Sequence, residues 1–157
     1  MTWDAIGALG EVIGAAGVIA SLLYLAVQVR ASTRASAVEA KLRSTRLLSD
    51  YMDSLIHDPE LNDLLRRGLA DLQSLSETES NRFAQLTLKA FWFFSAQHFQ
   101  FRIGTLSESD WQETRSPLHL FLRSPGFRSW WVERGRASFG PEFREFIEAE
   151  MAELDAA

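Results

Sequence analysis

The apolar run from Ala5 to Gln28 limits the folds open to this chain more than any other feature. As a helix it is about 36 Å long, which is enough to cross a hydrocarbon core of about 30 Å. Val12–Val29 contains no charged residue, and Trp3 and Tyr24 lie near the two ends, where amphipathic aromatic side chains favour a membrane interface. The run therefore predicts one transmembrane helix.

Two alternatives to this span fit the flanking charges less well. A cleaved signal peptide begins with basic residues, whereas the first basic residue here is Arg30. A buried helix of a soluble protein would not require the basic collar Arg30–Arg46, which carries five basic residues against one acidic residue. By the positive-inside rule, we expect residues 1–30 to hold the span with its N-terminus outside, and residues 31–157 to form a cytoplasmic domain.

Small residues recur along one face of the predicted span. Successive spacings of four and three residues give an unbroken heptad pattern, and it contains Trp3, Gly7, Gly10, Gly14, Gly17, Ser21, Tyr24 and Gln28. Small side chains allow membrane helices to approach closely. Frequent glycine in membrane helices is the alternative explanation. We interpret Gly7, Gly10, Gly14, Gly17 and Ser21 as a helix-packing interface with other chains, which predicts a homo-oligomer or contact with another membrane protein.

Charged residues in and beside the span suggest two further contacts. Asp4 and Glu11 lie on one side of the helix, where they would reach the outer headgroups or form an acidic ring in an oligomer. Basic side chains after the span are predicted to contact the headgroups of membrane lipids; they are Arg30, Arg34 and Lys41.

The remaining sequence predicts an all-α fold, in which the span continues into a cytoplasmic helical bundle. Apolar spacing extends the first helix to about Ile56, and Asp58 with Pro59 starts a second. The capping box Ser76–Glu79 starts a third helix that runs to Gly104. Later helices are predicted to start at Ser107, with an interruption near Pro117, at Ser124, and at Pro141, the last one ending near Glu153.

Aromatic residues surround nearly the whole circumference of the third helix. Such a helix is the centre of a bundle, a subunit interface or a membrane-inserted segment. The adjacent Trp130 and Trp131 should point to different sides, one into the core and the other toward an interface or the membrane surface. The side chains assigned to a partner surface are therefore Phe91, Phe94, Trp130 and Trp131.

No arrangement of residues in the sequence indicates catalysis, so we do not expect an enzyme or a cofactor. The chain has no cysteine, and no glycine-rich phosphate loop or nucleophile elbow is present.

Asp50, Asp53 and His57 share one helix face, but they supply too few ligands for a metal and are better interpreted as a solvated face. The carboxylates of residues 142–155 are also expected to be solvated. The basic collar lacks aromatic residues and the rest of the chain is acidic, which argues against nucleic-acid binding.

The segments "WDAIGALGEVIG" and "LLYLAVQVR" resemble the leader of an uncharacterised family of small bacterial single-span membrane proteins. This resemblance covers residues 3–30 and is faint beyond them, in "SPGFRSWW" and "FGPEFREFI". The resemblance implies the membrane topology and a bacterial origin; the family has no assigned activity, so it supplies no functional residues. Two functions remain: a self-assembling membrane protein that forms a pore or scaffold, and an accessory or adaptor subunit of a larger membrane complex.

Overall fold

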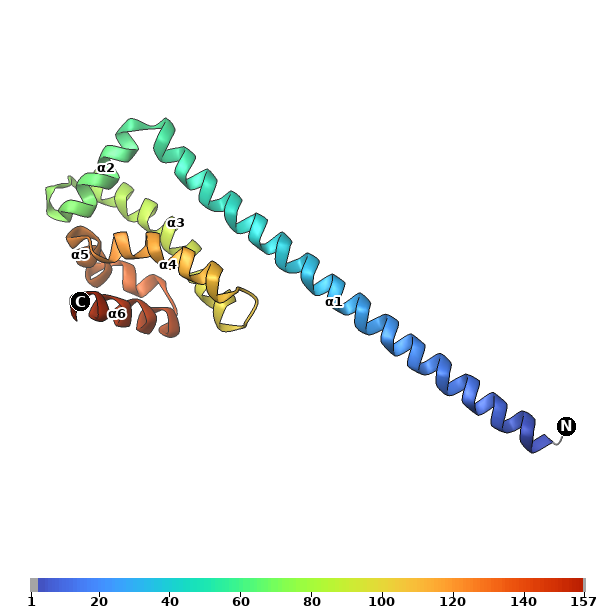
Figure 1. Ribbon diagram of the computed structural model, residues 1–157. Coiled ribbons are helices and arrows are strands. Elements are labelled where there is room, and N and C mark those ends of the chain that lie inside the picture. The colour runs from blue at the N-terminus through green and yellow to red at the C-terminus, as the bar shows by residue number, and fades with distance from the viewer. Residues whose placement is uncertain (1–2, 157) are drawn as a thin grey trace. The chain divides into compact units, whose positions relative to one another are not determined.

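The computed structural model describes the backbone of residues 3–156 (Figure 1). Within this range it describes all side chains except those of residues 3–13, 15, 16, 34–38, 40 and 44. The described chain is helical and contains no strand, which confirms the all-α prediction. Its residues group by contact into two units, Met1–Leu42 and Arg43–Ala157. The boundary predicted after residue 30, between the span and the cytoplasmic domain, is based on the basic residues that begin at Arg30, and it stays a prediction.

The helices begin where the sequence supplies caps. The elements are α1 (Trp3–His57), α2 (Pro59–Ala70), η1 (Leu72–Ser74), α3 (Glu77–Arg102), α4 (Glu108–Leu122), α5 (Pro125–Glu133), η2 (Gly135–Ser138) and α6 (Pro141–Ala156). Asp58 accepts a hydrogen bond from the Leu61 amide at the start of α2. Ser76 and Glu79 form the predicted capping box of α3, and Ser107 caps α4. Each cap satisfies amide groups that have no partner inside the helix.

The predicted interruption near Pro117 is wrong, because α4 continues through the proline to Leu122. A proline removes one backbone hydrogen bond of a helix. Tertiary packing compensates here, since α4 buries an apolar stripe on both sides of Pro117; the stripe contains Trp111, Thr114, Leu118 and Leu122.

The core of the C-terminal unit is aromatic and centres on α3. The Phe91 ring is fully buried and lies near seven other rings. Its nearest neighbour is Phe127 of α5, at a centroid distance of 4.5 Å. Helix α3 is therefore the centre of a bundle, which is one of the three positions predicted for this aromatic helix.

Helices α2 and α5 approach closely at a pair of glycines. A Cβ atom at Gly126 would lie 1.8 Å from the carbonyl oxygen of Gly68. Gly68 itself lies under the ring of Phe83, where a Cβ would come within 2.3 Å of the ring. The backbones of α2 and α5 can meet because Gly126 lacks a side chain, and the Phe83 ring of α3 can pack on α2 because Gly68 lacks one.

Candidate functional site

The described glycines of the predicted helix-packing interface, Gly14 and Gly17, have open space beside them in the N-terminal unit. No atom lies within 4 Å of the position that a Cβ would take at Gly14 or Gly17. Ser21 is exposed and donates a hydrogen bond to the Gly17 carbonyl, at 2.8 Å, so its hydroxyl is satisfied within the helix. The side chains at Gly7 and Gly10 lie outside the described residues.

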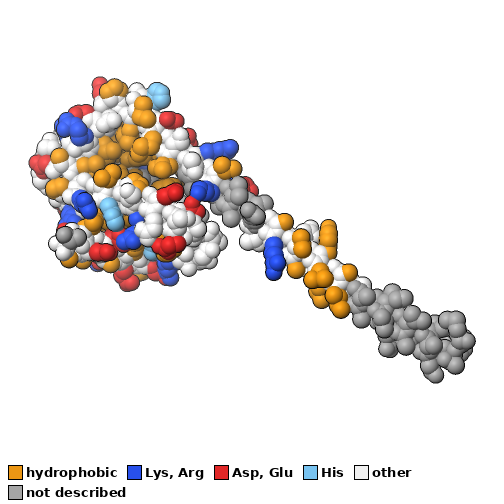
Figure 2. Space-filling view, viewed as in Figure 1, with side chains coloured by type: hydrophobic (Ala, Val, Ile, Leu, Met, Phe, Trp, Pro, Cys, Tyr) orange, Lys and Arg blue, Asp and Glu red, His pale blue; other side chains and the backbone are white. Residues whose placement is uncertain are grey.

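The apolar residues after Gly17 are exposed on every side of α1 (Figure 2). Eight large side chains have exposed fractions between 52% and 69%; they are Val18, Ile19, Leu22, Leu23, Tyr24, Leu25, Val27 and Val29. Within the described residues, no helix has a stretch long and apolar enough to cross a membrane. The predicted span begins at Ala5, and most of its first half lies outside the described side chains, so it stays a prediction.

The charged residues predicted to meet the membrane are described only in part. Asp4, Glu11 and Arg34 lie outside the described side chains. Arg30 and Lys41 are exposed on α1.

The predicted partner surface is wrong, because its four residues belong to the core. Phe91, Phe94, Trp130 and Trp131 have exposed fractions of 0%, 3%, 1% and 1%. The two tryptophans are both buried, since the short helix α5 is enclosed by α2, α4, η1 and η2.

Two other aromatic residues of α3 are exposed instead. Trp92 and Phe99 have exposed fractions of 61% and 58%. Their spacing of seven residues places them on one face of the helix, and Ile103, the C-cap residue four positions further on, is 55% exposed. Sequence reasoning missed this face because aromatic residues surround α3, so periodicity alone does not separate its buried side from its exposed side.

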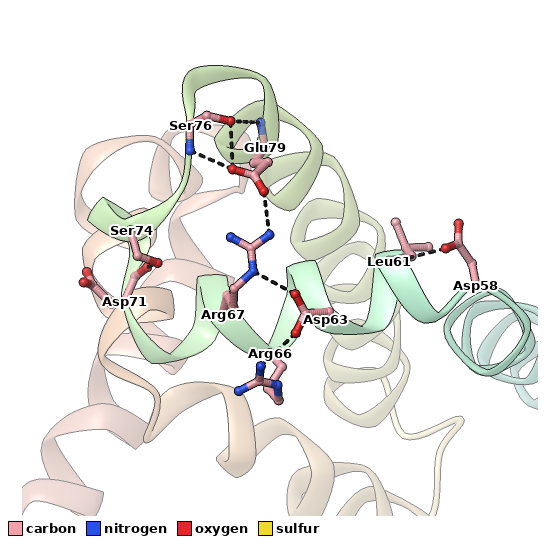
Figure 3. A network of polar contacts seen from close by, with 9 residues as sticks. All are labelled: Asp58, Leu61, Asp63, Arg66, Arg67, Asp71, Ser74, Ser76 and Glu79. Carbon is pink, nitrogen blue, oxygen red and sulfur yellow. Dashed lines mark hydrogen bonds and ion pairs between the residues drawn. The ribbon is translucent and has the colours of Figure 1, made fainter.

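An ionic network joins the start of α3 to α2 (Figure 3). Asp63 accepts hydrogen bonds from Arg66 at 2.7 Å and from Arg67 at 2.8 Å. Arg67 also donates to Glu79, which accepts from the amide and hydroxyl of Ser76. Asp63, Arg67 and Glu79 border a surface hollow of about 440 Å³ between the two helices.

The charges of this network are fixed rather than poised for proton transfer. The Arg67 hydrogen bond, supported by Ser76, lowers the pKa of Glu79 from 4.5 to about 2. Hydrogen bonds from Arg66 and Arg67 likewise lower the pKa of Asp63. A general acid or base needs a pKa near the working pH. The network therefore joins α2 to α3 through carboxylates that stay ionised at neutral pH.

A second ionic cluster joins α4 to α6. Glu150, with a side chain only 9% exposed, accepts two hydrogen bonds from Arg115, at 2.6 and 3.1 Å. Its Oε2 also lies 2.6 Å from His119 Nε2. The expectation that the carboxylates of the last helix are solvated is wrong for Glu150, because its partners come from a helix distant in sequence.

No metal centre is evident in the described chain. No group of three or more histidine, aspartate or glutamate side chains in that part could hold a metal ion. The His57 ring bonds the backbone carbonyl of Asp53 through Nδ1 at 2.8 Å. His98 stacks on Phe146, and burial, with Arg102 nearby, lowers its pKa.

Comparison with protein-family models, with curated proteins and with solved structures finds no match to this chain.

Proposed function

We propose that this protein is a self-assembling bacterial inner-membrane protein whose first helix packs against the same helix of other copies. The observation that carries the proposal is the exposure of all eight large apolar side chains between Val18 and Val29. An apolar surface of this extent marks contact with protein or membrane. The segment has no neighbour in its own unit that could cover it on all sides.

The small-residue face gives the assembly its contact surface. In lipid, the burial of apolar area does not drive helices together, so close backbone approach must supply the attraction. Gly14 and Gly17 leave the room that such an approach needs. Ser21 adds no unsatisfied polar group to the contact, because its hydroxyl is bonded within its own helix.

The charges beside the span complete the proposed topology. The N-terminus lies in the periplasm, and the basic residues from Arg30 onward lie in the cytoplasm next to anionic headgroups. The C-terminal unit supplies a cytoplasmic scaffold and carries out no reaction. Assembly around Glu11 and Asp4 would form either a pore or a scaffold.

The test replaces Gly14 and Gly17 together with leucine in the full chain. The matched control introduces leucine at Ile19 and Ala26, which lie on the opposite face of the helix at 100° per residue. Both variants keep the segment apolar, so both should insert. Native mass in mild detergent should show a defined oligomer for the wild type and the control, and loss of the oligomer for the glycine variant.

Two results would refute self-assembly through this face. One is a wild-type protein that is monomeric in mild detergent, which would favour an accessory subunit of another complex. The other is a glycine variant that assembles as well as its control. In that case the glycines reflect the usual composition of membrane helices.

A further inference from the structure

Three arginines from three separate elements line one surface hollow of the C-terminal unit. Arg134 follows α5, Arg136 belongs to η2, and Arg144 lies on α6. The hollow has a volume of about 280 Å³, and its other lining residues are Val132, Glu133 and Ala137. Its lining side chains therefore carry three positive charges and one negative charge.

Two of these arginines are held on a rigid base. Gly135 lies between them and packs directly on Trp130, where a Cβ atom would come within 2.5 Å of the ring. The Trp130 side chain is 1% exposed and belongs to the aromatic core. The backbone that carries Arg134 and Arg136 is thus fixed by the core, and such support preorganises a binding site.

Hydrogen bonds orient two of the three guanidinium groups, and only that of Arg136 is paired with a carboxylate. Arg134 Nη1 donates to the neutral amide oxygen of Asn81 at 3.1 Å. Arg136 Nε pairs with Glu148 at 2.8 Å. Among the described residues, no carboxylate forms an ion pair with Arg134 or Arg144 within 4.0 Å.

We propose that this hollow binds a phosphate group, either free phosphate or the phosphate of an anionic lipid headgroup. Like charges that converge in this way repel one another, and a bound anion would relieve the repulsion. A planar guanidinium matches the oxygens of phosphate with paired N–H donors. Arg134 and Arg144, which form no ion pair with a carboxylate of the described chain, supply the main donors for the anion. This inference does not depend on the proposed membrane assembly, because it concerns only the C-terminal unit.

The experiment measures which arginines are protected by phosphate from chemical modification. The wild-type full chain in neutral detergent is treated with phenylglyoxal under two conditions, one with inorganic phosphate and one with chloride at the same ionic strength. The modified arginines are then mapped by mass spectrometry. A second arm places the protein in phosphatidylcholine nanodiscs with and without phosphatidic acid. Arg66 is the control, because its side chain is 72% exposed and lies outside the hollow.

Selective protection of Arg134 and Arg144 by inorganic phosphate would identify a free-phosphate site. Protection only in discs that contain phosphatidic acid would identify a headgroup site. Absence of protection in both arms would overturn the proposal. Equal protection of Arg66 would overturn it too, because the effect would then be general screening.

Two substitutions give a second readout. In a calorimetric titration with the anion that protects, Arg134→Gln and Arg144→Gln should each weaken binding about tenfold, the value expected for one charge-assisted contact. Arg66→Gln removes the same charge elsewhere and should leave the affinity unchanged. Equal weakening by all three substitutions would show that net charge, and not the hollow, determines binding.

Discussion

Replacement of Gly126 by alanine tests the closest contact in the C-terminal unit. The new Cβ would lie 1.8 Å from the carbonyl oxygen of Gly68, whereas ordinary contact starts at 3.4 Å. The obstacle is backbone, so no side-chain rotation can relieve it. Helices α2 and α5 must therefore separate by about 1.6 Å at this point, the difference between those two distances.

The expected loss of stability follows from two opposing effects. Overpacking of a well-packed core costs about 1–3 kcal/mol, and we expect the upper end because the helices must move as rigid bodies. Alanine is a better helix former than glycine by about 1 kcal/mol, which offsets part of the loss. The net destabilisation is then about 2 kcal/mol, or a fall in Tm of roughly 10 °C for a domain of this size.

The assay is thermal unfolding of the full chain in mild detergent, followed by circular dichroism. Gly140→Ala is the matched control, because no atom lies within 4 Å of the added Cβ and its φ is not positive. Gly140 directly precedes α6 and its carbonyl accepts from the Arg144 amide, so alanine should cost less than about 1 kcal/mol, the difference from glycine at a helix N-cap. Equal midpoints for the two variants would refute the close packing of α2 against α5.

Two further predictions concern the core and the ionic network. Phe91→Ala should destabilise the protein by about 3–5 kcal/mol in denaturant unfolding, whereas Phe99→Ala, at a 58% exposed position, should have little effect; equal losses would contradict the assigned buried face of α3. The folded pKa of Glu79, about 2, lies below its ordinary value of 4.5, so its contribution to stability is present above pH 4.5 and is lost as the pH falls toward 2. Between pH 4.5 and pH 2, the urea midpoint of Glu79→Gln should therefore change less with pH than the midpoint of the wild type. The same change with pH in both proteins would show that the Arg67 contact is absent in solution.

Local features of the fold could be predicted from the sequence because a helix cap involves only neighbouring residues. Asp58, Ser76 with Glu79, and Ser107 mark helix starts, and each makes its predicted hydrogen bond to an amide within three residues. Proline at the first helical position marked α2, α5 and α6 in the same way. The helical class and the order of the elements follow from these signals together.

Features that depend on packing between distant segments could not be predicted. The sequence around Trp130 and Trp131 does not reveal that α5 is covered on several sides. The continuity of α4 through Pro117 depends on a buried stripe whose partners are other helices. The burial of Glu150 depends on Arg115, which is 35 residues away. In the phosphate-site proposal, likewise, Arg134 and Arg144 come together only through the tertiary fold.

The glycines of the two units connect the fold to the proposed assembly. In the C-terminal unit, Gly126 lets α5 approach the backbone of α2, and Gly68 makes room on α2 for the Phe83 ring of α3. In the N-terminal unit, Gly14 and Gly17 offer the same kind of surface, but no described atom of the chain lies against them. Glycine in a helix costs about 1 kcal/mol at each position, and close packing is what compensates for that cost. If the glycines of both units serve close packing, this supports the proposal that the helix covering Gly14 and Gly17 comes from another copy of the chain.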